Sequence, residues 1–256
     1  MNWKAFLAML SRDAHVARRN FVPMVMQTML QPMLFTFVFG RVLVSGGMMT
    51  QSYQDLLIPG VMAITMLMTG VMGVAMPLIA EFQFSREIED RLLAPMAIEW
   101  LAVEKILGGM IQALAAGAVV APAAWLVLGR GTAVSFSNVA QFACIAILVA
   151  MMSSAGGLLL GCSVGQTQIG LLFSMVLAPM IMFGCAYYPW SALAAFPVVQ
   201  KLVLINPLVY ASEGLRGTMT PHVPHMDLAL VIGVLAVMNI ALIALGLNRF
   251  VKKAVG

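Results

Sequence analysis

The sequence predicts an all-α membrane protein that crosses the bilayer six times and forms a single domain. Of its 256 residues, 62% are hydrophobic and only 9% are charged, which is too little charge for a protein surrounded by water. From Gly131 to Gln200 the chain contains no Asp, Glu, Lys, Arg or His. Because ion-driven carriers usually keep ionisable groups inside the membrane, this gap indicates that any driving force comes from another polypeptide.

The first predicted element, residues 1–20, is an amphipathic helix that lies along the membrane surface. One face is an apolar stripe made by Trp3, Phe6, Leu7, Leu10, Ala14 and Ala17. The opposite face is largely basic and is made by Lys4, Arg12, His15, Arg18 and Arg19. A soluble helix docked on a partner is the alternative interpretation, and the two are compatible.

Long apolar runs then predict the membrane-crossing helices. They lie near residues 21–44, 56–80, 101–128, 138–162, 168–188 and 228–247, so residues 21–188 hold the first five spans and residues 248–256 form a basic tail. With the amino terminus inside, ten Lys and Arg residues fall on the inner side and four on the outer side. This asymmetry predicts that both termini are cytoplasmic.

The segment between the last two spans, residues 189–227, is too long for a tight turn and too apolar for a solvated loop. Two short apolar runs in it, 192–199 and 202–205, are interrupted by prolines. Runs of this length are typical of re-entrant or interfacial helices, so we expect this outer segment to enter the membrane and return.

Charge is concentrated between the second and third spans. Six of the ten acidic residues lie between positions 81 and 104. Within 81–96, the pairs Arg86 with Asp90 and Glu87 with Arg91 are four residues apart, which favours a short helix, and Pro95 ends it. The helix is either a solvated connector or, as the clustering of charge favours, a docking helix for a soluble partner.

The outer stretch 206–217 contains the charged residues Glu213 and Arg216, three positions apart, which are expected to pair on one helical face. Asn206 and Pro207 predict the start of that helix, and Gly217 its end. The pair either stabilises a re-entrant hairpin or takes part in gating or substrate contact.

Other candidate sites are weak. His222, His225 and Asp227 lie close together, but intervening prolines break a regular ligand spacing, so no metal site is predicted. The three cysteines are far apart and are expected to be free thiols. Glycines at every fourth position of the fourth span predict close helix packing: Gly157, Gly161 and Gly165.

Catalytic and nucleotide-binding signatures are missing from the sequence. There is no G-x-x-x-x-G-K-[ST] phosphate loop, no G-x-S-x-G and no H-E-x-x-H. The chain is therefore not expected to be an enzyme by itself or to hold a cofactor, and its modest positive charge indicates membrane orientation rather than nucleic-acid binding.

Three stretches of the chain resemble the membrane (permease) subunit of type-2 ATP-binding-cassette exporters, the group of nodulation-factor, polysaccharide and drug-resistance exporters. They are FVPMVMQTMLQPMLFTFVFG at 21–40, FSREIEDRLLAPM at 84–96 and YYPWSALAAFPVVQKLVLINPLVYASEGLRG at 187–217. The last is the most specific, because it combines an aromatic-Pro start, an Asn-Pro-Leu core and a Leu-Arg-Gly end.

This resemblance implies a bacterial inner (plasma) membrane protein that works with a second permease copy and a separate nucleotide-binding subunit, which binds ATP and magnesium. It also implies that a coupling helix transmits force from the ATPase through Arg86, Glu87, Glu89, Asp90 and Arg91. The apolar spans suit a hydrophobic or amphipathic substrate such as a drug, a lipid or a lipid-linked glycan. A self-contained carrier or channel, or a membrane anchor for a soluble complex, are the alternatives.

Overall fold

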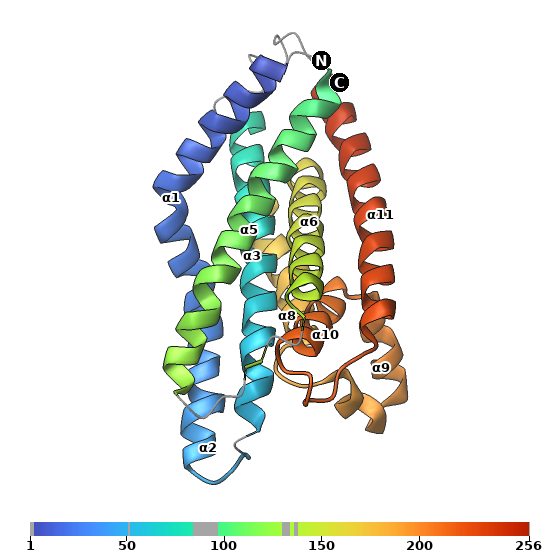
Figure 1. Cartoon of the computed structure of the whole chain (residues 1–256). Helices are drawn as coiled ribbons and strands as arrows, with labels where there is room; N and C mark the ends of the chain where they lie inside the picture. Colours follow the sequence, from blue (N-terminus) through green and yellow to red (C-terminus); the bar gives the residue numbers. More distant parts are fainter. Residues whose placement is uncertain (1–2, 51, 84–96, 130–133, 136–137, 256) are drawn as a thin grey trace.

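A computed structural model describes residues 3–50, 52–83, 97–129, 134–135 and 138–255 of the chain. In these residues helices are joined by turns and no strand occurs, which confirms the all-α prediction. The two termini lie at the same end of the molecule, which we call the inner end (Figure 1). The opposite end, where the chain turns after the first long helix, is called the outer end.

Five helices in the described part of the chain are long and apolar enough to cross a membrane. The first is the stretch Arg18–Ser45, which begins within α1 (Trp3–Phe37) and continues beyond it, and the others are α3 (Tyr53–Gln83), α5 (Ile98–Leu128), α6 (Val139–Ser163) and α11 (Leu228–Val255). Of the six predicted spans, the first four and the last are present as full-length helices. The chain is therefore a multi-pass membrane protein.

The first helix differs from the prediction. A separate surface helix over 1–20 was expected, but α1 continues without a break from Trp3 to Phe37 and passes through Pro23 and Pro32. Residues 4–22 contain no Gly or Pro that would end a helix, so the expected surface helix and the first span form one continuous helix, whose membrane-crossing stretch begins at Arg18. A π-helical turn (Val38–Val42) and the short α2 (Leu43–Ser45) complete this arm at the outer end.

The predicted span at 168–188 is shorter than expected. Its helical part consists of α7 (Ile169–Leu172), a π-helical turn (Phe173–Leu177) and α8 (Ala178–Met182). A bilayer crossing needs about 20 apolar residues, so this segment falls short of a full span by length. Six full-length spans are therefore not found among the described residues.

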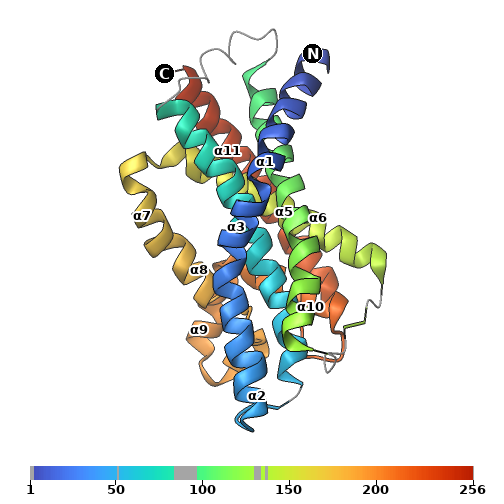
Figure 2. The ribbon, with the colours of Figure 1, turned by 90° about the vertical axis from the view of Figure 1, so that its left-hand side faces the viewer.

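The outer segment folds into short helices close to the outer end (Figures 1 and 2). A 3₁₀ turn (Trp190–Ala195), α9 (Pro197–Leu202) and a second 3₁₀ turn (Val203–Ile205) lead to α10 (Pro207–Met219), which is buried from Leu208 onward. The predicted end at Gly217 is wrong, since α10 continues to Met219. Gly217 instead allows close packing, because a Cβ there would come within 2.6 Å of Leu228.

Helix α3 forms the centre of the bundle and packs against α1, α5, α6 and α10. Its contact with α6 is close: a Cβ on Gly157 would lie 2.7 Å from the carbonyl oxygen of Val71, and one on Gly161 would lie 3.0 Å from Cα of Ala75. The predicted packing role of these two glycines is confirmed, whereas Gly165 lies beyond the end of α6.

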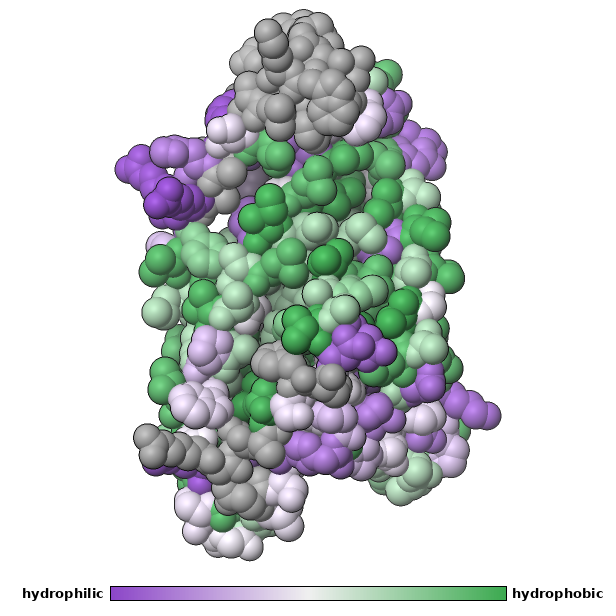
Figure 3. Space-filling model, viewed as in Figure 1, coloured by the Kyte–Doolittle hydropathy of each residue, from purple (hydrophilic) through white to green (hydrophobic). Residues whose placement is uncertain are grey.

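The surface matches a membrane environment. On the face that Figure 3 shows, a mostly apolar band crosses the middle of the molecule, and hydrophilic residues gather toward both ends. One face of α1 contributes a row of exposed apolar side chains spaced four residues apart: Val22, Met26, Leu30 and Leu34.

Adding a methyl group at the α3–α6 contact should destabilise the fold. Gly157→Ala places a Cβ against the backbone of Val71, and such overpacking typically costs about 1–3 kcal/mol. Thermal unfolding of the purified protein in detergent should show a clearly lower Tm. The matched control is Gly156→Ala, where a Cβ would meet nothing within 4 Å; equal Tm values for the two variants would contradict the packing role.

Candidate functional site

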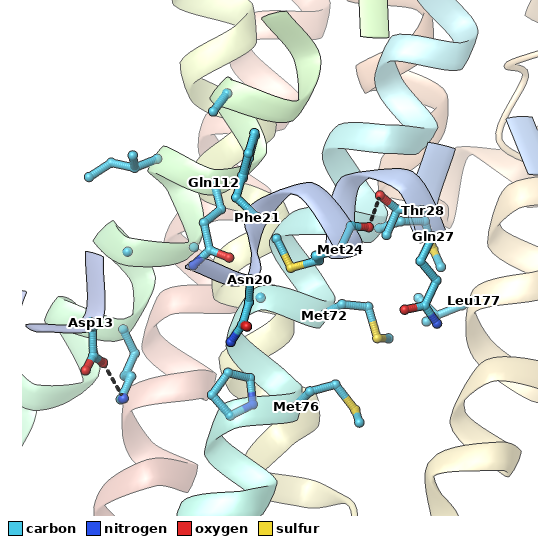
Figure 4. Close-up of a pocket in the computed structure, with 18 of the residues that line it drawn as sticks. Asp13, Asn20, Phe21, Met24, Gln27, Thr28, Met72, Met76, Gln112 and Leu177 are labelled. Atoms are coloured by element: carbon cyan, nitrogen blue, oxygen red, sulfur yellow. Dashed lines mark hydrogen bonds and ion pairs between the residues drawn. The ribbon is translucent and has the colours of Figure 1, made fainter. Parts of the chain in front are cut away.

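A groove of about 1430 Å³ opens between four parts of the bundle, and Figure 4 shows some of the residues that line it. It is bounded by α1, α3, α5 and the short helices α7 and α8. Ligand pockets for drug-sized molecules span roughly 300–1,000 Å³, so this groove has room for a larger molecule or for an extended chain.

The wall of the groove is apolar but carries uncharged polar groups. Methionine thioethers come from three helices: Met24, Met68, Met72, Met76 and Met182. Side-chain carboxamides come from two helices: Asn20, Gln27, Gln31 and Gln112. Gln112 of α5 lies against Gly73 of α3, where a Cβ would come within 2.8 Å of its Oε1. Methionine side chains are flexible and polarisable, so such a wall can adapt to differently shaped apolar ligands.

Three charged side chains that pair with one another line the inner end of the groove. The Lys105 ammonium of α5 donates hydrogen bonds to Asp13 of α1 and Glu81 of α3, each with a distance of 2.6 Å from Nζ to the carboxylate oxygen. The Lys105 side chain is only 5% exposed. We call these residues the inner ion cluster; it joins three helices by charge-assisted hydrogen bonds.

The sequence did not reveal the inner ion cluster. Glu81 and Glu104 were assigned to a charged loop, but they lie in α3 and α5 and are buried. Asp13 and Lys105 are 92 positions apart, so no local spacing could have signalled their contact. The core of the predicted docking helix, with Arg86, Glu87, Glu89, Asp90 and Arg91, lies outside the described residues. The cluster flanks that segment, because Glu81 precedes it and Lys105 follows it in the chain.

A second buried charge pair lies in the outer segment. The predicted pairing of Glu213 with Arg216 is observed, at 2.5 Å, and both side chains are at most 1% exposed. The Arg216 guanidinium also donates to the carbonyl oxygen of Cys185 at 2.7 Å, while Glu213 accepts from the backbone amides of Trp190 and Met226. This outer network ties α10 to the turn before α9 and to the turn before α11.

Asn206 and Pro207 start α10 as predicted. The Asn206 side chain caps the helix by accepting from the amide of Leu208 at 3.0 Å, and its amide group donates to the carbonyl oxygen of Met180 at 2.7 Å. Pro207 occupies the first turn of the helix, where a missing amide hydrogen is harmless. The four sequence-predicted outer residues therefore all lie at the start of α10 or within it: Asn206 and Pro207 are half-buried at its start, and Glu213 and Arg216 are buried in its body.

The three residues of the weak metal motif are separated by their contacts. His222 Nε2 lies 2.9 Å from Asp55 of α3, His225 contacts the carbonyl oxygen of Met226, and Asp227 caps α11 by accepting from Ala229 and Leu230. In the part of the chain that the structure describes, no three metal-ligating side chains converge.

A family model described as ABC-2 type transporter matches residues 4–220, most of the chain. The chain belongs to the ABC-2 type transporter family. This confirms the resemblance seen in the sequence and identifies the protein as a permease subunit of a transporter rather than a catalytic component.

Curated relatives of this ABC-2 permease show the same relationship. Over 224 residues it is 26% identical to the inner membrane transport permease YadH of Escherichia coli K12, an alignment that covers 84% of this chain and 82% of the relative. The permeases of the same name from Escherichia coli O157:H7 and Shigella flexneri match with the same identity and coverage. No solved structure matches the chain significantly.

Breaking the inner ion cluster should weaken the ABC-2 permease. Lys105→Met leaves the Asp13 and Glu81 carboxylates without their shared ammonium, and removing one partner of a buried ion pair costs about 3–5 kcal/mol. Thermal unfolding in detergent should show a large fall in Tm. The triple variant Lys105→Met, Asp13→Asn, Glu81→Gln should recover part of it, because the two carboxylates that Lys105 pairs with are then replaced by uncharged amides.

Lys252→Met, on the exposed face of the last turns of α11, is the matched control. A Tm for Lys105→Met equal to that of this control would show that the inner ion cluster does not hold the helices together.

The outer network should be similarly sensitive. Glu213→Leu leaves the buried Arg216 without its carboxylate and strands two backbone amides, so a loss of about 3–5 kcal/mol is expected. Glu213→Gln keeps one acceptor oxygen and should cost less. Limited proteolysis and Tm measurements check the order. Lys201→Gln, exposed on α9, is the control, and a Glu213→Leu variant as stable as this control would contradict the assignment.

Proposed function

We propose that this permease is the membrane subunit of an ATP-driven exporter of hydrophobic or amphipathic molecules. The single observation that carries the proposal is the groove, which lies in the inner half of the bundle and whose inner end is lined by the inner ion cluster. A substrate would enter it from the cytoplasm or the inner leaflet. The family membership supports a separate ATP-binding subunit as the source of energy, since the sequence holds no phosphate loop.

In the proposed mechanism, two permease copies and two ATPase subunits form the transporter. ATP, held with magnesium by the partner, closes the ATPase dimer and pushes on the charged segment between α3 and α5. That segment joins the helices that carry Glu81 and Lys105, so a push on it would be transmitted to the inner ion cluster and, through Asp13, to α1. Movement of α1 would change the width of the groove.

We further propose that both termini are cytoplasmic and that the protein resides in the bacterial inner membrane. The common position of the termini at one end and the excess of Lys and Arg in the inner segments support this orientation. The relative YadH is named an inner membrane transport permease, which supports the proposed location in the inner membrane. In this orientation the outer segment, with Asn206, Pro207, Glu213 and Arg216, is a re-entrant element that closes the outer end of the transport path.

The inner ion cluster is also the feature that supports the alternative of a self-contained carrier. Buried carboxylates near a lysine are typical of proton-coupled transport, and the inner ion cluster contains such groups. They lie at the inner ends of the helices and are paired across three of them, which fits a mechanical joint better than a proton path through the membrane.

Charge reversal in the docking segment tests the proposal. Affinity purification of the tagged permease from native membranes should recover an ATPase, and the complex should hydrolyse ATP in mild detergent. Glu87→Lys with Arg91→Glu should weaken the association by about tenfold or more, because like charges would face each other across the interface. Quantitative mass spectrometry of the recovered ATPase measures the loss.

The control reverses two exposed charges near the same end of the molecule, Arg249→Glu with Lys252→Glu, and should retain the ATPase. A permease that purifies alone and transports in proteoliposomes under a proton gradient without ATP would replace the exporter with the carrier.

A further inference from the structure

The lining of the groove is divided into a charged end and an uncharged body. Of the described residues, six charged ones line it, three basic and three acidic, so their formal charges cancel: Arg12, Arg18 and Lys105, and Asp13, Glu81 and Glu104. All six lie toward the inner end. Beyond them, the lining residues of α1 from Asn20, of α3 before Glu81, and of α5 after Lys105 carry no charge. The described lining of the body of the groove therefore offers no counter-ion to a charged ligand.

The uncharged body still presents hydrogen-bonding groups. Among the described residues, the carboxamides of Asn20, Gln27, Gln31 and Gln112 have no hydrogen-bond partner. Figure 4 shows Asn20 and Gln27 on α1 and Gln112 on α5 around the space next to Met72 and Met76. A carboxamide both donates and accepts hydrogen bonds, so it complements hydroxyl and amide groups equally well.

We propose that the groove binds uncharged amphiphiles that carry hydroxyl or amide groups on an apolar body, and that it discriminates against amphiphiles with a net charge. The methionine wall holds the apolar body, and the carboxamides of α1 and α5 hold the polar groups. A charged head would have to leave water without meeting an opposite charge, which is costly in an apolar wall. The proposal rests on the proposed function, because it names the class of substrate that this groove would take.

Hydrogen bonds to carboxamides that are left unpaired would also give selectivity. An amphiphile whose hydroxyl or amide groups pair with these carboxamides gains hydrogen bonds that a purely apolar molecule cannot make. A purely apolar molecule of the same length should therefore bind more weakly than an amphiphile with a hydroxylated head.

Protection of an introduced cysteine from alkylation tests the proposal on the permease alone. In a Cys144→Ser background, which removes the exposed native thiol, Met76→Cys places a thiol in the groove. Met26→Cys on α1, 62% exposed and outside the groove lining, is the matched control. Both variants are placed in phosphatidylcholine nanodiscs, and the rate of alkylation by a membrane-permeable maleimide is measured.

Five probes of similar chain length separate the possible ligand chemistries. Decyl glucoside offers hydroxyls, decanoyl-N-methylglucamide adds an amide, decyltrimethylammonium is cationic, decyl sulfate is anionic and decane is apolar. At ten times Kd, mass action leaves about one site in eleven open, so the two neutral amphiphiles should slow alkylation of Met76→Cys about tenfold. The charged probes and decane should slow it much less, and none should affect Met26→Cys.

Removing the carboxamides tests their role directly. Replacing Gln27, Gln31 and Gln112 by Leu should raise the concentration of decyl glucoside needed for half-protection by about tenfold or more, since each lost hydrogen bond weakens binding. Gln141→Leu, an exposed position on α6 outside the groove, should change nothing. Unchanged alkylation of Met76→Cys without probe would show that the triple variant keeps its fold.

Three results would overturn the proposal: equal or better protection by a charged probe, equal protection by decane, or a Met76→Cys thiol that is unreactive without any probe and cross-links to a second copy. The last result would mean that another permease copy covers the groove. Because no ATPase is present, failure here is distinct from failure of the exporter proposal, which the recovery of an ATPase decides separately.

Discussion

Close backbone contact along α3 is the constraint on which the rest of the bundle depends. In a bilayer, lipid tails are as apolar as the helices, so packing contacts and hydrogen bonds have to hold helices together. Glycines supply that contact on several sides of α3: Gly157 and Gly161 of α6 meet its backbone, and its own Gly60 lies against the carbonyl group of Ala186. The central helix thereby positions α1 and α5 around the groove and the outer segment at the other end.

Polar interactions then fix the two ends of this apolar bundle in different ways. At the inner end, one ammonium joins carboxylates from two other helices, so its geometry depends on how α1, α3 and α5 are placed. At the outer end, Glu213 and Arg216 bond mainly to backbone groups within a single compact unit. The distances within the inner ion cluster therefore change whenever α1, α3 and α5 move relative to one another, whereas the outer network holds a single segment together.

Local patterns in the sequence predicted whatever depends on local chemistry. Apolar runs located five full-length helices, Asn206 and Pro207 marked the start of α10, and the spacing of Glu213 and Arg216 gave their pairing. The sequence did not predict contacts between distant segments. Examples are Asp13 with Lys105, His222 with Asp55, and the groove bounded by α1, α3, α5, α7 and α8. Gly217 was misread because a glycine that ends a helix and one that allows close packing look the same in sequence.

Glu81 and Glu104 were expected in a charged loop, but they lie within α3 and α5. Charges that flank a loop are ordinarily solvated, yet these two are buried where α3 and α5 approach α1. That position matters for the proposed mechanism. A force on the segment between α3 and α5 acts first on the two helices that carry Glu81 and Lys105. Because Lys105 also holds Asp13, the same force reaches α1, and α1 carries three of the four groove carboxamides. Coupling and substrate contact would then meet on a single helix, so substrate in the groove would oppose or favour the movement that ATP drives.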